Sequence, residues 1–335
     1  MKAYEIRDGF GVDALALADR PDPAPGPGQV VVKNRAVSLN FRDLLVVKGD
    51  YSRKLPLPMT PCSDCAGEVA AVGDGVTRVK VGDRVAGIFM QSWIEGEVNE
   101  TKARSALGGT IGGVLAESVV LHENGLTHIP AHLSFEEAAT LPCAGVTAWH
   151  ALFEKERIKS GDTVVTLGSG GVSLFALQFA RLAGARVIST SGSDEKLTRL
   201  KSLGASAGIN YKTTPDWDKP VRDLTGAGAD HIVEVGGAGT LPKSLKAVRM
   251  GGTISLIGNV TGGGEVNPVP VLMKTIRLQG IFVGSRAMFE AMNRAISLAS
   301  MRPVVDRVFE FDQAREAMHY MESGAHFGKI CIRVG

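Results

Sequence analysis

The chain has 335 residues, a length that favours two domains over one. With 44% hydrophobic and 21% charged residues it has the composition of a folded protein, and its formal charge of +2 gives no general attraction to nucleic acid or anionic membranes. No apolar run reaches the ~18 residues that span a bilayer, and the N-terminal MKAYEIRDGFG has no signal-peptide pattern. We therefore expect a cytoplasmic protein with neither a nucleic-acid nor a membrane partner.

The first part of the chain, residues 1–124, is predicted to be rich in β-structure. Short strands are expected at residues 30–33, 67–73 and 81–87, the last two of which are punctuated by glycine. Residues 92–113 are polar and contain few strand-forming residues. This composition predicts a long loop, of the kind that often serves a functional site.

Beyond residue 125 the pattern changes to apolar strands that alternate with amphipathic helices, two of which are expected at residues 173–183 and 194–203. Several of the strands are apolar on both faces, as buried parallel strands are. The alternation predicts an α/β fold with a doubly wound parallel sheet. Its six strands are expected at residues 163–167, 186–190, 207–210, 231–235, 253–257 and 276–281.

The residues after Ser285 form a third segment that could rejoin the first part of the chain. Helices are expected there at residues 288–300 and 313–322, and strands at 307–310 and 329–334. We therefore expect two domains. One consists of residues 1–124 with 285–335, and the other of residues 125–284.

A glycine-rich turn follows the first strand of the second domain and opens a helix; it reads Gly168-Ser169-Gly170-Gly171-Val172-Ser173. A dinucleotide-binding turn needs one glycine for the tight bend and a second for close approach of the pyrophosphate, and Gly168 and Gly170 occupy these places. The helix N-terminus then offers N–H groups to the phosphates. The third position of the motif holds Ser173 instead of glycine or alanine. The βαβ context favours a dinucleotide site, and an ordinary glycine turn is the alternative.

The end of the second strand of this domain bears on the choice between NAD and NADP. An NAD-binding domain usually carries an acidic residue there, which binds the ribose hydroxyls. Here the strand ends in Thr190-Ser191-Gly192-Ser193, and Lys196 follows one turn into the next helix. Small residues and a cation favour a 2′-phosphate, so NADPH is the expected cofactor and NADH the alternative. Asp194 and Glu195 are expected to be first-turn acids of that helix.

Several motifs in this order resemble the zinc-free, quinone-oxidoreductase-like branch of the medium-chain dehydrogenase/reductase superfamily, over essentially the whole chain. They lie at residues 38–43 (SLNFRD), 66–69 (AGEV), 81–85 (VGDRV), 141–148 (LPCAGVTA), 168–173 (GSGGVS) and 328–329 (GK). The resemblance implies a GroES-like catalytic domain, a Rossmann domain and an active site in the cleft between them.

The resemblance also implies cofactor contacts at individual positions. Where NADPH-using quinone reductases hold the 2′-phosphate with a glycine, a lysine and a tyrosine, this chain has Gly192, Lys196 and Tyr211. Thr147 falls near the nicotinamide. An arginine near the C-terminus of some relatives is replaced by Gly324, which leaves Lys329 as the candidate there. The middle of the cofactor is expected to cross the ends of later strands, at Val235, Gly236 and Gly258.

By the same resemblance, Asn40, Ser63 and Cys143 stand where zinc-dependent members have their three ligands. Of these side chains only the cysteine binds zinc well, so no metal is expected. Cys62 and Cys65 have C-x-x-C spacing without a second pair, which favours two small buried hydrophobic residues. An unusual zinc site that draws on Cys62, Asp64, Cys65 or Cys143 is the alternative.

Without a metal, hydrogen-bond donors must stabilise the charge that forms on the acceptor oxygen. Asn40 is the expected donor, because it replaces a metal ligand. The resemblance adds Tyr51 and Asp43 as catalytic candidates. Asp43 is equally consistent with a structural carboxylate that caps nearby backbone, and Tyr51 with a packed aromatic ring. Trp93 is expected to be either a pocket wall or an exposed anchor of the long loop.

Hydride transfer to a quinone, or to a carbon–carbon double bond conjugated to a carbonyl, needs less help from a Lewis acid than reduction of an isolated ketone does. We therefore expect an NADPH-dependent reductase of quinones, enals or enones. An alcohol dehydrogenase or ketone reductase of the same superfamily and a non-catalytic NADPH-binding protein are the alternatives. The strand at residues 276–281 is expected at the sheet edge, where pairing with its copy, as in relatives, would form a homodimer. A tetramer is the other possibility.

Overall fold

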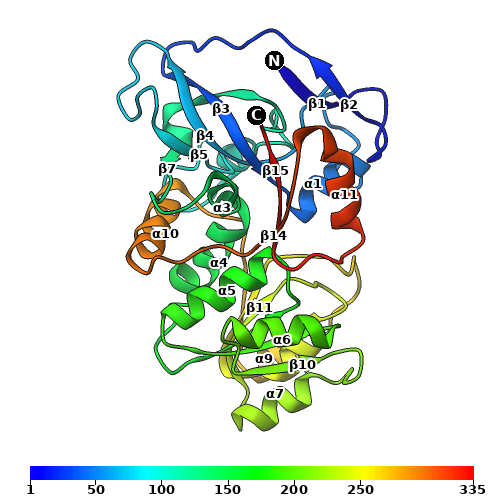
Figure 1. Ribbon diagram of the computed structural model, residues 1–335. Helices are drawn as coiled ribbons and strands as arrows, with labels where there is room; N and C mark the ends of the chain where they lie inside the picture. Colours follow the sequence, from blue (N-terminus) through cyan, green and yellow to red (C-terminus); the bar gives the residue numbers. More distant parts are fainter. The chain divides into compact units, whose positions relative to one another are not determined.

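The computed structural model describes residues 1–335 and divides them into two units, which Figure 1 shows in the colours of the sequence. One unit contains residues Met1–Val146 and Val283–Gly335, and the other contains Thr147–Phe282. The C-terminal segment therefore packs with the N-terminal part of the chain.

The first unit is built on a seven-stranded sheet in the order β14-β15-β3-β4-β5-β7, with β6 paired to β3. The last strand of the chain, β15, is parallel to β14 and antiparallel to β3, so it lies inside the sheet. A separate hairpin pairs β1 with β2. The bounds are β1 (Lys2–Ile6), β2 (Leu15–Asp19), β3 (Gln29–Ser38), β4 (Asp64–Val72), β5 (Arg84–Gly87), β6 (Ser118–His122), β7 (Leu126–His128), β14 (Val305–Phe309) and β15 (Lys329–Arg333).

Residues 125–146, which the sequence pattern places in the second domain, pack in the first unit. The reason is that β7 pairs with β5, and helix α3 (Phe135–Ala139) packs on β3 and β4. A π-helical turn, Leu141–Gly145, follows and leads into the short helix α4 (Val146–Trp149). The other helices of this unit are α1 (Phe41–Lys48), α2 (Glu100–Ala103), α10 (Arg286–Leu298) and α11 (Ala314–Glu322).

The predicted long loop at residues 92–113 contains the single turn of α2 and is fixed at its start by Trp93. The Trp93 side chain is only 1% exposed, packs with Phe89, Met90 and Ala106, and donates a hydrogen bond from Nε1 to the Gly96 carbonyl oxygen at 2.8 Å. The expectation of an exposed loop anchor is therefore wrong, because the indole packs in an apolar cluster beneath the loop.

The second unit is the predicted six-stranded parallel sheet, in the order β10-β9-β8-β11-β12-β13. This is the doubly wound order, in which the chain reverses direction across the sheet between its first and fourth strands, β8 and β11. The bounds of its elements are β8 (Thr163–Leu167), α5 (Gly171–Leu182), β9 (Arg186–Ser191), α6 (Asp194–Ser202), β10 (Ala207–Asn210), α7 (Asp218–Thr225), β11 (Ala229–Glu234), α8 (Leu241–Ala247), β12 (Val248–Leu256), α9 (Val269–Met273) and β13 (Arg277–Gly280).

The α/β prediction is confirmed, and in the second unit the strand boundaries lie within two residues of those expected, except that β12 begins at Val248 instead of residue 253. The pair Gly251-Gly252 resembles a turn in the sequence, but Ala229 of β11 pairs with Val248 across a register shift and so extends the strand. In the first unit, β3, β4 and β5 differ by more, since strands were expected at residues 30–33, 67–73 and 81–87. None of the helices is long and apolar enough to cross a membrane.

Candidate active site

Lys329, the first residue of β15, reaches the turn between β3 and α1 in the first unit. Its ammonium group donates to the side-chain oxygen Oδ1 of Asn40 at 2.6 Å and also to the Leu39 carbonyl oxygen. Lys329 is 3% exposed and Asn40 is also buried. Because an ammonium group can only donate, the Asn40 amide must turn its oxygen to Lys329 and its Nδ2 group away from it.

The Nδ2 group of Asn40 lies 3.5 Å from the Ser63 hydroxyl, which donates to Asp64 Oδ1 at 2.7 Å. The other carboxylate oxygen of Asp64 accepts the Cys143 backbone N–H at 3.0 Å. Asn40, Ser63, Asp64, Cys143 and Lys329 therefore form one connected group, which we call the Asn40 network. It brings together the three positions that resemblance singled out, at Asn40, Ser63 and Cys143, and it adds a carboxylate and an ammonium group.

Asp43 lies beside this network at the start of α1. Its Oδ2 accepts the Asn40 backbone N–H at 2.8 Å, and its Oδ1 is buried without a partner. Burial raises the pKa of Asp43 to about 7, with the Asp64 charge adding to this rise, although nearby Arg42 opposes it. These contacts make Asp43 a cap that fixes the backbone of Asn40, as the structural alternative supposed.

The Asn40 network does not fit a zinc ion. The Asn40 oxygen is occupied by an ammonium group and the Ser63 hydroxyl donates to a carboxylate, and amide and hydroxyl side chains are not the ligands that zinc prefers. The structure contains no group of three His, Cys, Asp or Glu residues that could hold a metal ion. The alternative site of Asp64, Cys65 and Cys143 is not formed, because neighbouring residues of a strand point to opposite faces.

Tyr51, the third catalytic candidate, lies in a different contact. Its ring is 44% exposed and stacks on Arg42, whose guanidinium carbon is 5.0 Å from the Tyr51 ring centroid and 4.7 Å from that of Phe89. Arg42 also donates to the Leu107 carbonyl oxygen at 2.7 Å. The structure thus joins Asn40 and Asp43 directly, and places Tyr51 with Arg42.

In the second unit, the glycine-rich turn joins β8 to α5. Gly168 has a φ of +75°, which only glycine adopts without strain, and its N–H donates to the Thr190 carbonyl oxygen of β9 at 2.9 Å. Gly170 caps α5 without a side-chain hydrogen bond, and a Cβ atom added at Gly168 or Gly170 would meet nothing within 4 Å. The amides of the first helical turn therefore face open space, which fits a pyrophosphate.

Ser173 explains the departure from the glycine motif. Its hydroxyl donates to the Leu167 carbonyl oxygen at 2.6 Å and is buried, so it links the end of β8 to the first turn of α5. Ser169, Gly171 and Val172 complete the turn beside it. The turn thus keeps its open edge while a side chain replaces the close helix–strand packing that a third glycine allows.

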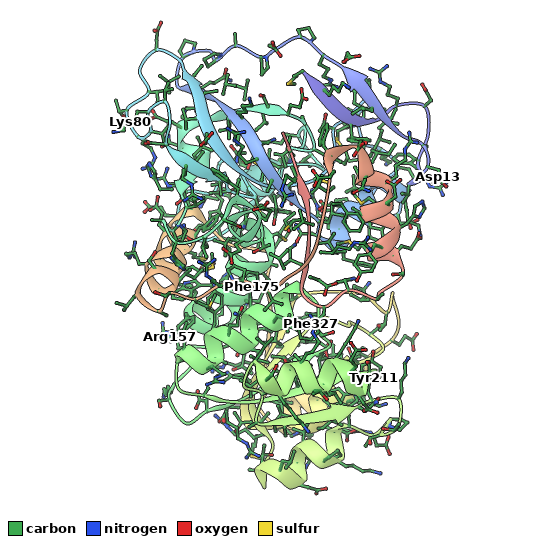
Figure 2. All side chains as sticks on the ribbon, in the orientation of Figure 1. Asp13, Lys80, Arg157, Phe175, Tyr211 and Phe327 are labelled. Carbon is green, nitrogen blue, oxygen red and sulfur yellow. The ribbon has the colours of Figure 1, made fainter.

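The carboxyl end of β9 carries the residues expected to hold the 2′-phosphate. Gly192 follows β9, Lys196 lies in the first turn of α6, and Tyr211, labelled in Figure 2, follows β10. A Cβ atom at Gly192 would lie 2.9 Å from the Tyr211 hydroxyl, so the glycine lets this side chain approach. The structure therefore places Tyr211 directly over Gly192.

The remaining cofactor candidates lie at the ends of later elements. Thr147 is buried on α4, and a Cβ atom at Gly258 would meet the Val235 carbonyl oxygen at 2.4 Å, so the ends of β11 and β12 approach closely. The N–H of Gly236 donates to the buried Glu234 carboxylate at 2.8 Å. Glu234, which the sequence reasoning missed, also accepts from Gly237 and two hydroxyls and so shapes the turn after β11.

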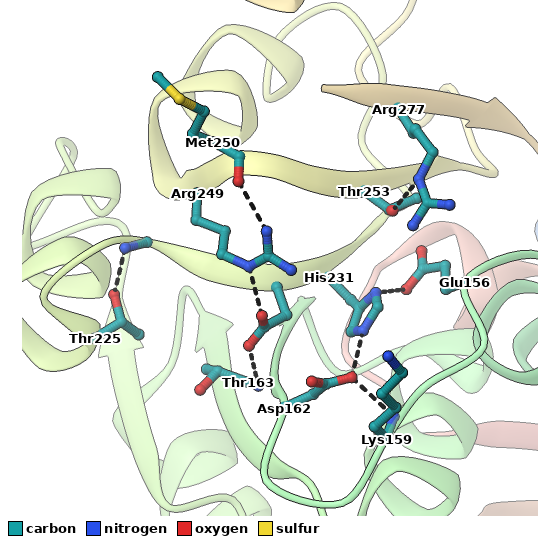
Figure 3. A network of polar contacts seen from close by, with 12 residues as sticks. Glu156, Lys159, Asp162, Thr163, Thr225, His231, Arg249, Met250, Thr253 and Arg277 are labelled. Carbon is teal, nitrogen blue, oxygen red and sulfur yellow. Dashed lines mark hydrogen bonds and ion pairs between the residues drawn. The ribbon is translucent and has the colours of Figure 1, made fainter. Parts of the chain in front are cut away.

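A second cluster of titratable side chains lies at the amino ends of the same parallel strands (Figure 3). The buried His231 ring places Nδ1 2.8 Å from Glu156 Oε2 and Nε2 2.9 Å from Asp162 Oδ2. Ser255 donates a hydrogen bond to Glu156. Since the site of a parallel sheet lies at the carboxyl ends of its strands, this cluster is structural.

The charge state of His231 should make the second unit less stable as pH rises. Burial lowers the pKa of His231, but the hydrogen bonds and charges of Glu156 and Asp162 outweigh it, so the pKa lies above the ordinary value of 6.5. Burial also raises the pKa of Glu156. Both groups bind protons more tightly in the folded state, so stability from His231 is fully present below pH 6.5 and is lost as the pH rises through its folded pKa.

We therefore expect His231→Gln to slow no catalytic step but to increase hydrogen exchange in β8 and β11, with the largest difference from wild type near pH ~6 and a smaller one near pH ~8.5. His319→Gln, which removes an exposed histidine ion-paired to Asp13 in the first unit, is the control. If the difference in hydrogen exchange between His231→Gln and wild type grew with pH, the folded unit would carry His231 in its neutral form.

Comparison with known proteins agrees with this architecture. The family model described as "Alcohol dehydrogenase GroES-like domain" matches residues 26–131, and that described as "Zinc-binding dehydrogenase" matches residues 171–298. A zinc-type alcohol dehydrogenase-like protein of Schizosaccharomyces pombe is 46% identical over 99% of both chains. The quinone oxidoreductase of Rattus norvegicus is 30% identical over 99% of this chain and 97% of its own.

Solved structures give the same result. An NAD-dependent alcohol dehydrogenase matches all of both chains with 37% identity and a TM-score of 0.91. A mycobacterial protein solved in complex with NADPH matches 99% of both chains with 27% identity and a TM-score of 0.83.

Proposed function

Because the chain belongs to the medium-chain dehydrogenase/reductase superfamily and is an oxidoreductase that uses a nicotinamide cofactor, we propose that it transfers hydride from NADPH to a quinone or an α,β-unsaturated carbonyl compound without a catalytic metal. The observation that carries this proposal is the Asn40 network. At the positions where zinc-dependent members have ligands, it presents an amide N–H group backed by a buried ammonium group.

The nicotinamide supplies the hydride, and the protein must orient the acceptor and stabilise the charge that forms on its oxygen. Asn40 is the donor in this proposal. Its Nδ2 group lies 3.5 Å from the Ser63 hydroxyl and also interacts with the Asp64 carboxylate, and in this proposal it donates to the substrate oxygen when substrate binds. The ammonium group of Lys329, bonded to the amide oxygen, polarises the amide and makes its N–H a stronger donor. In this proposal the buried Lys329 ammonium serves substrate polarisation through Asn40, in place of the cofactor contact that the resemblance implies.

Such a donor suits conjugate reduction better than reduction of an isolated ketone. When hydride adds to the β-carbon of an enone, the negative charge is shared between the oxygen and the α-carbon, so a single polarised N–H group stabilises much of it. Full charge on an isolated alkoxide benefits more from a metal ion. This difference favours quinones, enals and enones over simple ketones and alcohols.

NADPH is the proposed cofactor because β9 ends at Ser191 and is followed by Gly192, so the strand end itself carries no carboxylate, and the nearby acids belong to the first turn of α6. Asp194 Oδ1 accepts a hydrogen bond from Asn210 at 2.8 Å, Tyr211 lies against Gly192, and Lys196 lies in the first turn of α6. The pyrophosphate would lie on the turn from Gly168 to Val172, with Val235, Gly236 and Gly258 along its path and Thr147 near the nicotinamide. One similar structure holds NADPH, and another is described as NAD-dependent, so both cofactors must be measured.

The test of this function is the product formed from a simple enone. Protein treated with a metal chelator is incubated with NADPH, and saturated ketone is separated from allylic alcohol. We expect saturated ketone, formed at the same rate with and without chelator. Allylic alcohol that appears only after zinc is restored would contradict the proposal and identify an alcohol dehydrogenase.

We also propose that the chain forms a homodimer through β13. This strand lies at the edge of the sheet, and nearby Leu272 and Met273 of α9 are 76% and 68% exposed. An uncovered strand edge with adjacent exposed apolar side chains is a common pairing surface. A monomer in sedimentation equilibrium would contradict this proposal, whereas a tetramer would require a second interface.

A further inference from the structure

The ends of β9 and β10 bring a side chain to Gly192 that the motif comparison does not assign. Lys212 follows Tyr211 after β10, and its Cε atom would lie 3.0 Å from a Cβ atom added at Gly192. The Tyr211 hydroxyl would lie 2.9 Å from the same point. Both side chains therefore fold over the glycine, and the absence of a Cβ atom there is what admits them.

The course of the chain at Lys212 is fixed by Asn210, the last residue of β10. The Oδ1 atom of Asn210 accepts the Lys212 backbone N–H at 3.0 Å, and its Nδ2 group donates to Asp194 Oδ1 at 2.8 Å. A backbone N–H can only donate, so the amide orientation is determined. The Tyr211 backbone N–H donates to the Ser191 carbonyl oxygen at 3.1 Å, which ties this turn to the end of β9.

Near Gly192 the structure places the ammonium group of Lys212 and the carboxylate of Asp194, which already accepts a hydrogen bond from Asn210. The Lys212 side chain is exposed and its ammonium group forms no ion pair in the structure. Asp194 is the acidic residue closest in sequence to Gly192, and its Oδ1 is engaged by Asn210. A phosphate monoester carries about −1.5 to −2 charges at neutral pH, more than one lysine neutralises.

We propose that Lys212 is a second cation for the 2′-phosphate of NADPH, beside Lys196, and that Asn210 is a positioning residue that holds Asp194 away from this phosphate. The inference rests on the proposed use of NADPH and assigns two residues that determine cofactor choice. Lys212 acts by direct contact with the phosphate. Asn210 acts through Asp194 and through the backbone of Lys212.

The test is the dissociation constant of each reduced cofactor, measured by titrating nicotinamide fluorescence without any substrate. Lys212→Gln is expected to weaken NADPH binding about 10- to 100-fold, as loss of a charge-assisted hydrogen bond does, and to leave NADH binding unchanged. Lys212→Arg should retain most of the preference for NADPH over NADH, because arginine keeps the positive charge. The matched control is Lys219→Gln, which removes an exposed lysine on α7 that pairs with Asp216.

Asn210→Ala frees the Asp194 carboxylate and is expected to weaken NADPH binding about 3- to 10-fold without weakening NADH, because a like charge near the phosphate costs roughly 1 kcal/mol in this exposed setting. Adding Asp194→Asn to that variant should restore NADPH affinity. If Asn210→Ala weakened NADPH and NADH binding equally, and the double variant did not recover NADPH affinity, Asn210 would only maintain the fold.

The outcomes separate the two proposals. A wild-type protein that binds NADH as tightly as NADPH would contradict the proposed cofactor and, with it, this inference. A wild-type preference for NADPH that survives Lys212→Gln unchanged would leave the proposed cofactor in place and overturn the assignment of Lys212 alone.

Discussion

Replacing Asn40 with alanine is expected to lower kcat/KM for an enone by about 10²- to 10³-fold, the usual effect of removing one donor to a developing oxyanion. The substitution removes the Nδ2 group, and it also leaves the Lys329 ammonium without its side-chain acceptor. Binding of NADPH, measured by fluorescence, should not change, because the cofactor candidates other than Lys329 lie in the second unit.

Asn40→Asp is the matched variant, because it keeps an oxygen for Lys329 and replaces the N–H donor with a carboxylate. We expect it to lose as much activity as Asn40→Ala and to retain more stability, since the ammonium group stays paired. Full activity in Asn40→Asp would show that the amide N–H group donates nothing to the reaction, and the role assigned to the Asn40 network would then be wrong.

Replacing Lys329 with methionine is expected to cost the first unit about 3–5 kcal/mol of stability, because removing one partner of a buried pair leaves the other uncompensated. Lys329 is buried, its ammonium holds two oxygen atoms, and its charge lowers the pKa of Asp64, which burial raises. The change is measured by hydrogen exchange of peptides that cover β3 and β15.

Adding Asp64→Asn to Lys329→Met removes the carboxylate whose charge is left unbalanced, and we expect it to recover part of the lost stability but not the activity. Lys48→Met is the control, because that lysine forms an exposed ion pair with Glu322 in the same unit. If the double variant regained full kcat, the buried ammonium would be needed for folding alone.

The second unit could be predicted closely because its signals are local. Each strand is a short apolar run. The turn from Gly168 to Ser173 is recognisable from its glycines, and Gly168 has the positive φ that the bend requires. The start of β12 was missed for the same reason, since Gly251-Gly252 gives a local turn signal that pairing with β11 overrides.

The Asn40 network could be predicted only in part. Asn40 was found because it occupies a position with a known role in related chains, but its partner Lys329 lies 289 residues away, and no local pattern shows that a lysine at the start of a strand is buried. By resemblance alone, Lys329 falls among the cofactor residues. Glu234 was missed because a carboxylate at a strand end shows its role only when the amides of Gly236 and Gly237 fold around it.

The position of β15 inside the sheet of the first unit has a consequence for synthesis of the protein. The second unit is one continuous segment that is translated before β15, whereas the sheet of the first unit is completed only by that strand. Lys329 lies on β15, so the ammonium group that holds Asn40 becomes available only after the whole second unit has been translated. A chain truncated just before Lys329 keeps the whole second unit and lacks the cation of the Asn40 network, so we expect it to bind the cofactor without reducing an acceptor.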